Sequence, residues 1–351
     1  MGRRTAAVIV AAIAALALAA APILLALASP GGLGGLGPPD PRTASGEAIS
    51  ELYWFVFGIC AVVFVLVETA LVLFILRFRR RPTTSAQAEG PQIHGNTRLE
   101  IIWTIIPAVI LAAIAVVVMV RTPVVQASGE AGAADELVVQ VEGHQFYWRY
   151  VYPEGQIALD TLVLPVGRPV ALEITSFDVN HSWWVPELTG KQDAIAGEQH
   201  TLRFRPESEG SYEGVCAEFC GIFHAVMPTT VEVVSAAAFE QRLQELAGQD
   251  TAGEAQLALG RSSWENACAN CHGAEGQGDV GPPIARSPIL VDRQRLTDIL
   301  VNGQDTPGLP GRMPPVGRGW PDFQVEALIE YVRSREDLAA PGQQGGGGGG
   351  G

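Results

Sequence analysis

Two long apolar stretches constrain the fold of this chain more than any other feature of its 351 residues. One runs from Leu52 to Leu76 and the other from Ile101 to Val120. A helix needs about 20 mostly apolar residues to cross a bilayer, and a helix leaves no backbone polar group unsatisfied there. The sequence therefore predicts a transmembrane helix hairpin over residues 51–122, with helices at about 52–76 and 101–120.

Arginines crowd the segment that joins the two stretches, starting at Arg77 and Arg79. Loops rich in Lys and Arg stay on the cytoplasmic side of a membrane, so residues 77–100 are expected there. Everything after Val120 is then expected on the outer side, whether the first residues of the chain are cleaved or retained.

Residues 1–28 have the pattern of a signal peptide. Arg3 and Arg4 precede an apolar run that ends in Ala26-Leu27-Ala28, an A-x-A cleavage pattern. The alternative is a retained, alanine-rich membrane helix. Residues 29–50 are rich in Gly and Pro and are predicted to form a loop.

Two residues inside the first apolar stretch need separate interpretation. Glu68 interrupts it, and a carboxylate inside a membrane is a candidate for function, although it could equally pack against a partner helix. Cys60 has no second thiol nearby and is interpreted as a small apolar packing residue.

Charge and cysteine content narrow the chemistry. The net charge of −14 argues against a nucleic-acid partner and favours a basic protein partner or simple solubility. Five cysteines are too few for a disulfide scaffold. Four of them form two close pairs, at 216 and 220 and at 268 and 271, and paired cysteines beside histidine are typical of metal or haem chemistry.

From residue 135 to 235 the pattern changes to short β-branched runs broken by Gly and Pro. Runs that suit strands lie at 137–141, 146–152, 170–174 and 230–234. Strands at this spacing, with no helical pattern between them, favour a sandwich or a small barrel. An all-β domain is therefore expected over residues 135–235.

Soft metal ligands gather just before the last of these runs. Cys216, Cys220, His224 and Met227 place two thiols, an imidazole and a thioether in one short segment. Thiolate and thioether ligands select copper over magnesium or calcium. A single blue copper site needs only one thiolate, so two sulfurs could bridge a pair of copper ions. Such a pair needs a second histidine, and His181 lies upstream.

The last third of the chain has a helical pattern. A short linker helix is expected over residues 236–250 and an all-α module over residues 251–338. Helical patterns in this module lie at 253–270, 292–301 and 322–335. Asp292 is a candidate N-cap for the second of them. The glycine-rich tail over residues 339–351 is expected to be flexible.

Cys268-Ala269-Asn270-Cys271-His272 is the attachment motif of a c-type haem. Two thioethers would anchor the haem, with His272 as the proximal iron ligand. A distal thioether suits electron transfer, and Met313 follows on a proline-rich loop. The alternatives are a thioredoxin-like redox pair and half of a zinc site, but the sequence has no βαβ pattern around the motif and no second C-x-x-C.

On these motifs, from Leu52 to Arg335, the chain resembles subunit II of a haem–copper cytochrome c oxidase of the bacterial, caa-type form with a fused cytochrome c domain. The resemblance implies a cupredoxin-like copper A domain over residues 135–235 and a class I cytochrome c domain over residues 251–338. It also implies a bacterial plasma membrane, with both domains on the periplasmic or extracellular side.

The resemblance implies a binuclear copper A centre. Its ligands would be bridging Cys216 and Cys220, terminal His181 and His224, Met227 on one copper, and the backbone carbonyl of Glu218 on the other. The Glu218 side chain resembles a magnesium ligand at the boundary with subunit I, where a hard oxygen ligand suits the ion. Asp193 matches another stretch that faces this boundary.

Two further residues gain a meaning from the family. Glu100 matches a glutamate near the mouth of a proton channel, although a carboxylate at a helix start is favourable in itself. Phe146 stands where many members have a tryptophan used for electron entry from soluble cytochrome c. This departure fits a design in which the fused haem module delivers electrons, tethered at high effective concentration by its linker.

The implied function is that of the electron-entry subunit of a respiratory terminal oxidase. Electrons would pass from a cytochrome c donor through haem c and copper A to a separate subunit I, which reduces oxygen to water and pumps protons. One alternative is the copper A subunit of a nitric oxide reductase. Another is a membrane-tethered copper-binding or copper-delivery protein with a redox-sensing haem. The full set of copper ligands argues against quinol as the direct donor.

Overall fold

The computed structural model describes residues 37–78, 92, 94–126, 133–251, 253–305 and 312–339. The predicted signal peptide over residues 1–28 and all but the first residue of the predicted tail lie outside the described residues. The chain divides into two compact units, one formed by the long apolar helices and the other by the rest of the described chain.

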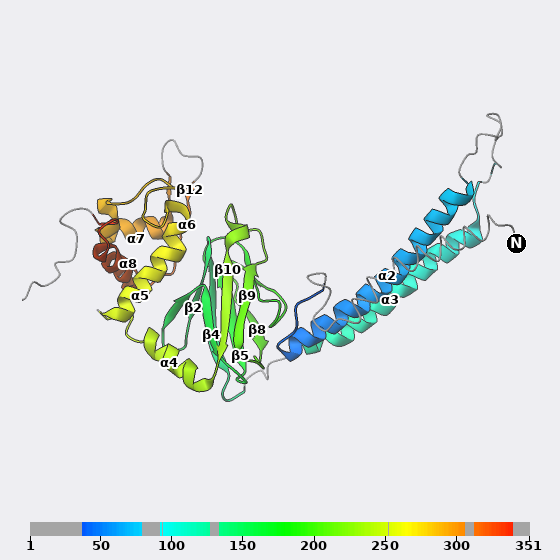
Figure 1. The fold of residues 1–351 in the computed structure, drawn as a ribbon, viewed down its shortest axis with the longest axis horizontal. Helices are drawn as coiled ribbons and strands as arrows, with labels where there is room; N and C mark the ends of the chain where they lie inside the picture. The colour runs from blue at the N-terminus through cyan, green and yellow to red at the C-terminus, as the bar shows by residue number, and fades with distance from the viewer. Residues whose placement is uncertain are drawn as a thin grey trace, which may run out of the picture. The chain divides into compact units, whose positions relative to one another are not determined.

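The first unit is a pair of long helices, α2 (Ala44–Phe78) and α3 (Thr97–Gln126) (Figure 1). Both are long and apolar enough to cross a membrane, and each contains an 18-residue stretch with a mean hydropathy of 2.9. Their apolar side chains face outward; Leu66 is 63% and Leu111 is 65% exposed. Such exposure is costly in water and favourable in lipid, so the predicted pair of apolar helices is confirmed.

The two helices extend beyond their apolar stretches. α2 begins at Ala44, inside the segment that was predicted as a loop over residues 29–50. The Thr43 hydroxyl oxygen accepts a hydrogen bond from the backbone N–H of Gly46 at 3.0 Å, and Glu47 lies in the first turn. A cap and an acidic first turn stabilise a helix start that hydropathy does not reveal.

The second unit contains a sandwich of two five-stranded sheets (Figure 1). The strands are β1 (Leu137–His144), β2 (Tyr147–Val151), β3 (Ile157–Leu159), β4 (Thr161–Pro165), β5 (Val170–Ser176), β6 (His181–Trp184), β7 (Gln192–Ala194), β8 (His200–Phe204), β9 (Gly210–Cys216) and β10 (Pro228–Val234). One sheet has the order β3-β2-β1-β5-β8 and the other β4-β10-β9-β6-β7. The β1–β5 and β4–β10 pairs are parallel. The predicted all-β sandwich is confirmed.

Large aromatic side chains fill the space between the sheets. Trp148, Trp183 and Phe204 are fully buried. The Trp183 Nε1–H donates to the Tyr150 hydroxyl at 3.0 Å, so this buried indole keeps a hydrogen-bond partner. A filled core of this kind holds the loops at its edge in fixed positions.

The C-terminal module is helical. Its elements are α5 (Glu254–Ser263), a π-helical turn (Trp264–Cys268), α6 (Ala269–His272), a 3-10 turn (Pro288–Val291), α7 (Arg293–Asn302), the short strands β11 (Gln304–Asp305) and β12 (Arg312–Met313), and α8 (Asp322–Ser334). Asp292 caps α7 as predicted, because its Oδ1 accepts from the Arg295 N–H at 3.1 Å. The single helical pattern predicted over 253–270 is divided by the π-helical turn, where buried Trp264 donates from Nε1 to the Ala274 carbonyl at 2.9 Å.

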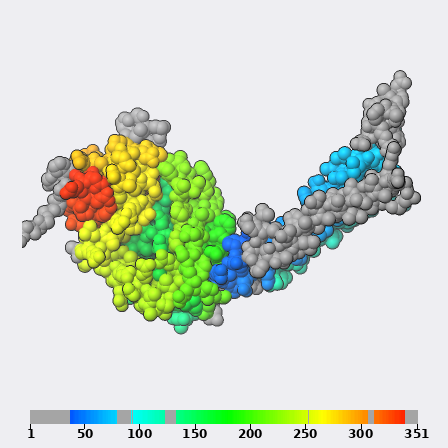
Figure 2. Space-filling view, in the orientation of Figure 1, coloured from blue at the N-terminus to red at the C-terminus, as the bar shows by residue number. Residues whose placement is uncertain are grey.

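The helix α4 (Ala236–Leu246), expected only as a linker, packs against the sandwich. Its Phe239 is buried in the sandwich core with the ring centroid 6.2 Å from that of Tyr152. The C-terminal module in turn covers β2 and β3, since Tyr147, Ile157 and Leu159 belong to its hydrophobic core. In Figure 2 the yellow atoms of this module lie directly against the green atoms of the sandwich.

Candidate metal and haem sites

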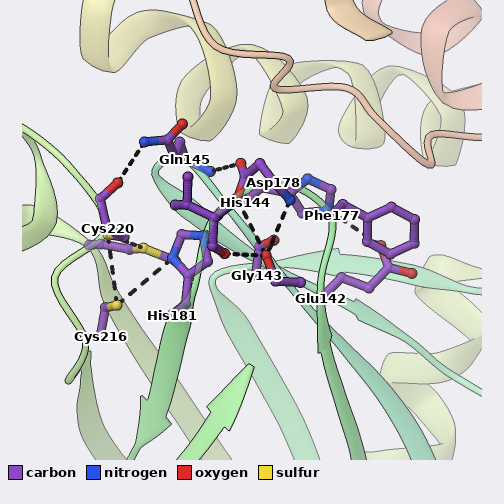
Figure 3. A network of polar contacts seen from close by, with 12 residues as sticks. Glu142, Gly143, His144, Gln145, Phe177, Asp178, His181, Cys216 and Cys220 are labelled. Atoms are coloured by element: carbon purple, nitrogen blue, oxygen red, sulfur yellow. Dashed lines mark hydrogen bonds and ion pairs between the residues drawn. The ribbon is translucent and has the colours of Figure 1, made fainter. Parts of the chain in front are cut away.

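The segment 216–227, called the cysteine loop below, has both of its ends held together by the sandwich. β9 ends at Cys216 and β10 begins directly after Met227, and the two strands pair antiparallel. The Cys216 N–H donates to the Met227 carbonyl at 3.0 Å. On the other side of β9, Trp183 of β6 pairs with Cys216. This register places His181, at the start of β6, beside the loop (Figure 3).

The six predicted copper ligands converge around two sulfur atoms. The Sγ atoms of Cys216 and Cys220 are 3.8 Å apart. The Cys216 Sγ lies 3.8 Å from His181 Nδ1 and 3.2 Å from the Glu218 carbonyl oxygen. The Cys220 Sγ lies 3.7 Å from His224 Nδ1 and 3.8 Å from Met227 Sδ. Each sulfur therefore has one imidazole nitrogen and one weaker donor beside it.

A network of polar side chains behind the cysteine loop orients the ring of His181. His181 is fully buried, and its Nε2 lies 2.8 Å from Asp178 Oδ1. This contact leaves Nδ1 facing Cys216, and a carboxylate on the second ring nitrogen is the usual support of a metal-binding histidine. Asp178 also accepts from the Gln145 N–H at 2.6 Å, and Gln145 Nε2 donates to the Cys220 carbonyl at 2.5 Å (Figure 3).

The pKa values of the two thiols are shifted in opposite directions. The neighbouring Cys220 thiol and, after it, His181 lower the pKa of Cys216. The Cys216 thiol and burial raise the pKa of Cys220. Burial works against protonation of His181, but Asp178 and Cys216 outweigh it and raise its pKa. Two adjacent thiolates repel each other unless cations lie between them, so this donor set fits soft metal ions.

The haem motif lies in the helical module. Cys268 and His272 are buried and Cys271 is half-buried. Burial raises the pKa of Cys268 to about 12, which argues against the reactive thiolate of a redox pair. The His272 Nδ1 lies 2.7 Å from the Pro282 carbonyl oxygen. A hydrogen bond to this carbonyl fixes the ring and leaves Nε2 for a metal, which fits a proximal haem ligand.

Met313 lies in β12, which pairs with β11. Its side chain is half-buried and packs against the hydrophobic core that contains Cys268. The conformation of Gly303 shapes this hairpin, since its φ is +68° and an added Cβ would lie 2.3 Å from the Met313 carbonyl oxygen. The structure thus places Met313 and the attachment motif against one core.

Glu100 and Glu68, the two membrane-helix carboxylates considered for function, have different settings. Glu100 lies in the first turn of α3, where its Oε1 accepts from the Asn96 N–H at 3.1 Å. This contact caps the helix, which is the structural alternative considered for Glu100. Glu68 lies within α2 with its side chain exposed on the helix pair.

The residues expected at the boundary with subunit I lie on the surface beside the cysteine loop. The Glu218 side chain is exposed. Asp193 accepts from the Ser182 hydroxyl at 2.7 Å and lies 3.3 Å from Lys191 Nζ. Ser182 follows His181 in β6, so Asp193 is connected to the candidate copper site through one neighbouring residue.

Phe146 lies under the cysteine loop. It is only 6% exposed, and its ring packs edge-on against Phe223 at 5.4 Å. An added Cβ on Gly221 would lie 2.9 Å from the Phe146 ring. The side chain supports the loop from within and offers little surface to an external protein.

Sequence reasoning did not find Asp178, Gln145 or Tyr147. Asp178 lies three residues before His181, and a carboxylate so close to a predicted metal-binding histidine was a signal that could have been used. Gln145 and Tyr147 gave no such signal, because their partners lie 75 and 169 residues away in the sequence.

Three family models match separate parts of the chain. Residues 32–119 match the transmembrane domain of cytochrome c oxidase subunit II, and residues 156–234 match its periplasmic domain. Residues 255–332 match subunit III of cbb3-type cytochrome c oxidase. The matches follow the helix pair, the sandwich and the helical module in order.

Individual relatives agree with these matches. A cytochrome c oxidase subunit 2 from Alkalihalophilus pseudofirmus is 30% identical over 310 residues, covering 84% of this chain and 89% of the relative. A cytochrome c oxidase subunit 2 from Synechocystis is 32% identical, covering 54% of this chain and 69% of the relative. The solved periplasmic domain of subunit II of cytochrome oxidase from Bradyrhizobium japonicum is 28% identical, with a TM-score of 0.31, covering 31% of this chain and 92% of that domain.

The fold and the matched families define a membrane protein with a cupredoxin-like domain and a C-terminal cytochrome c module. The chain belongs to the cytochrome c oxidase subunit II family, as part of a haem–copper oxidase. The family implies copper A, and the fused module implies haem c. Members work with other oxidase subunits in a membrane complex.

Proposed function

We propose that this chain is the electron-entry subunit of a respiratory terminal oxidase. It receives electrons from a cytochrome c donor and passes them by way of haem c and copper A to subunit I, where oxygen is reduced to water and protons are pumped. The observation that carries the proposal is the convergence of His181, the Glu218 carbonyl oxygen and Met227 on the two buried cysteines.

In this proposal Cys216, Cys220, His181, His224, Met227 and the Glu218 carbonyl hold the copper pair. Bound copper supplies one-electron redox chemistry, with the charge shared over two thiolates. The protein supplies rigidity: β6, β9 and β10 hold the loop ends, and Asp178 fixes the ring of His181. Ligands that do not move keep the reorganisation energy of electron transfer low.

Haem c would be attached covalently at Cys268 and Cys271, and His272 and Met313 would hold its iron. A bound haem supplies a second one-electron centre in the same chain. The contact between His272 Nδ1 and the Pro282 carbonyl keeps the imidazole in one orientation. Met313 belongs to a short hairpin packed on the same core, which suits a distal ligand that stays in place.

Three finer assignments complete the proposal. The Glu218 side chain, which is exposed, takes part in a magnesium site at the boundary with subunit I. Glu100 takes part in proton entry as well as capping α3. Both soluble domains lie on the periplasmic or extracellular side of a bacterial plasma membrane, where a soluble cytochrome c or a similar protein is the donor.

Purification of the intact membrane complex tests the proposal. We expect two coppers and one covalent haem in this chain, the electron paramagnetic resonance signal of mixed-valence copper, and oxygen uptake with reduced cytochrome c. A single blue copper would contradict the assignment of two bridging thiolates. Nitric oxide consumption without oxygen uptake would place the chain in a nitric oxide reductase.

A further inference from the structure

The end of the β1–β2 hairpin, residues 143–147 and called the turn below, touches the candidate copper ligands from one side. Gly143 lies so close to His181 that an added Cβ would be 2.8 Å from the imidazole Cδ2. Gln145 donates to the Cys220 carbonyl at 2.5 Å. The turn therefore contacts one ligand residue from β6 and another from the cysteine loop.

The last residue of the same turn contacts the haem module. The Tyr147 hydroxyl donates to the Val316 carbonyl at 2.5 Å and accepts from Trp320 Nε1 at 2.7 Å. Both partners lie in the 313–320 loop, which begins with Met313. Tyr147 is fully buried, and burial raises the pKa of its hydroxyl well above the usual range, so the group keeps its proton.

A stack of rings supports this contact. The His144 ring lies between Tyr147, 4.8 Å away with planes 5° apart, and Phe177, 5.4 Å away with planes 7° apart. Arg318 donates to the Phe177 carbonyl at 3.0 Å. An added Cβ on Gly319 would lie 2.5 Å from the Phe177 ring. The 313–320 loop is thus fitted closely to the sheet.

Charged groups and a second attachment point complete the interface. Buried Arg149 forms an ion pair with buried Glu142 and lies 3.5 Å from the Gly319 carbonyl oxygen. At β3, Gln249 exchanges two hydrogen bonds with the backbone of Ile157, each of 2.8 Å. The module is held at the chain segment that enters it and at the loop that carries Met313.

We infer that Tyr147 is a positioning residue which fixes the Met313-bearing loop against the turn that contacts His181 and Cys220. The haem module is then a docked part of the sandwich and not a domain that swings on its linker. This inference rests on the proposed function, because it assigns the positioning of the two redox sites to residues of one turn.

Hydrogen exchange and electron exchange in the purified full complex test the inference. Tyr147→Phe keeps the ring and removes the hydroxyl, which leaves the Val316 carbonyl and the Trp320 N–H without this partner. We expect amide exchange in residues 313–320 to rise about tenfold. We also expect one-electron exchange between the haem iron and the copper pair to slow, with both midpoint potentials unchanged. Trp320→Phe should reproduce both effects.

Tyr152→Phe is the matched control. Its hydroxyl is equally buried but bonds to the backbone of Val163 within the sandwich, so neither readout should move. Unchanged exchange at 313–320 in both Tyr147→Phe and Trp320→Phe would overturn the inference, as would faster amide exchange with an unaltered electron-exchange rate. A wild-type complex without copper or haem signals would contradict the proposed function instead, while the amide exchange would still report on the contact.

Discussion

At the scale of single residues, the two thiols of the cysteine loop differ in the direction of their pKa shifts. Cys216 has a lowered thiol pKa and Cys220 a raised one, although the two sulfurs have similar sets of neighbours. If either sulfur is removed, only one thiolate remains. One thiolate cannot replace the two sulfur bridges between the metal ions. The pair therefore acts as one ligand unit.

Cys220→Ser should abolish the binuclear centre. We expect the chain to lose the mixed-valence copper signal and to hold at most one copper, since a hydroxyl is a poor copper ligand. Copper analysis and electron paramagnetic resonance of the purified complex measure this. The haem spectrum, which depends on another part of the chain, is the internal control. Two retained coppers would show that Cys220 is not a bridging ligand.

Asp160 gives the sandwich a pH dependence. Burial raises the pKa of this carboxyl from 3.8 to about 7, and its Oδ1 accepts from the Trp148 N–H at 2.7 Å. The folded state thus holds a proton that the unfolded state loses near pH 4. The free energy of unfolding should therefore fall as the pH rises from about 4 to about 7, by at most about 4 kcal/mol. Water that reaches the carboxyl screens its charge and makes this loss smaller.

Asp160→Asn should remove this pH dependence. The amide oxygen can still accept from Trp148, and Asn tolerates the φ of 56° at this position. Melting temperatures of the complex between pH 4 and pH 7, followed by the copper absorption, measure the effect. An equal slope in the variant and the wild type would show that another group causes it.

At the scale of elements, the β11–β12 hairpin fixes the position of Met313. Gly303 ends α7 with a positive φ, and its Cα lies against the Met313 backbone. A Cβ at this point would force the hairpin to move, because it would lie 2.3 Å from the Met313 carbonyl oxygen, and a backbone atom has no rotamer to change.

Gly303→Ala should leave the haem attached but open to external ligands. We expect carbon monoxide to bind the reduced haem of the variant, because a displaced Met313 could no longer serve as the proposed distal ligand. Gly155→Ala is the matched control: Gly155 has a φ of +90°, but nothing lies within 4 Å of an added Cβ. Equal carbon monoxide binding by the two variants would argue against Met313 as the axial ligand.

At the scale of the whole chain, side-chain packing sets the boundary between the sandwich and the haem module. The boundary expected from sequence composition was a linker over residues 236–250. α4 contributes Phe239 to the sandwich core, and Gln249 bonds to β3. The segment expected as a linker over residues 236–250 is thus part of the surface that joins the two domains.

Two shortened chains should differ in stability. A chain that ends after Asp250 keeps α4, whereas one that ends after Val234 loses Phe239 from the core. Loss of a buried phenylalanine costs about 3–5 kcal/mol, so the shorter chain should melt at a lower temperature while both still bind copper. Thermal unfolding followed by circular dichroism measures this. Equal melting temperatures would show that α4 adds nothing to the sandwich.

Much of the architecture was predictable because it follows from local patterns. Long apolar stretches predict membrane helices, and β-branched runs predict strands. Asp292 was recognised as a cap from its place before a helical pattern, and its hydrogen bond to Arg295 agrees. The start of α2 was missed because its first turn is polar, so hydropathy does not distinguish it from a loop.

The sequence by itself determined the donor atoms of the candidate sites: two thiols, two imidazoles and a thioether in one pattern, and a haem attachment motif in another. Chemical type and short spacing are properties of the chain alone. Only the tertiary structure decided that Asp178 supports His181, that Gln145 contacts Cys220 and that Tyr147 joins the Met313 loop. The contacts of Gln145 and Tyr147 span 75 and 169 residues, and they form only when the two sheets and the helical module pack together.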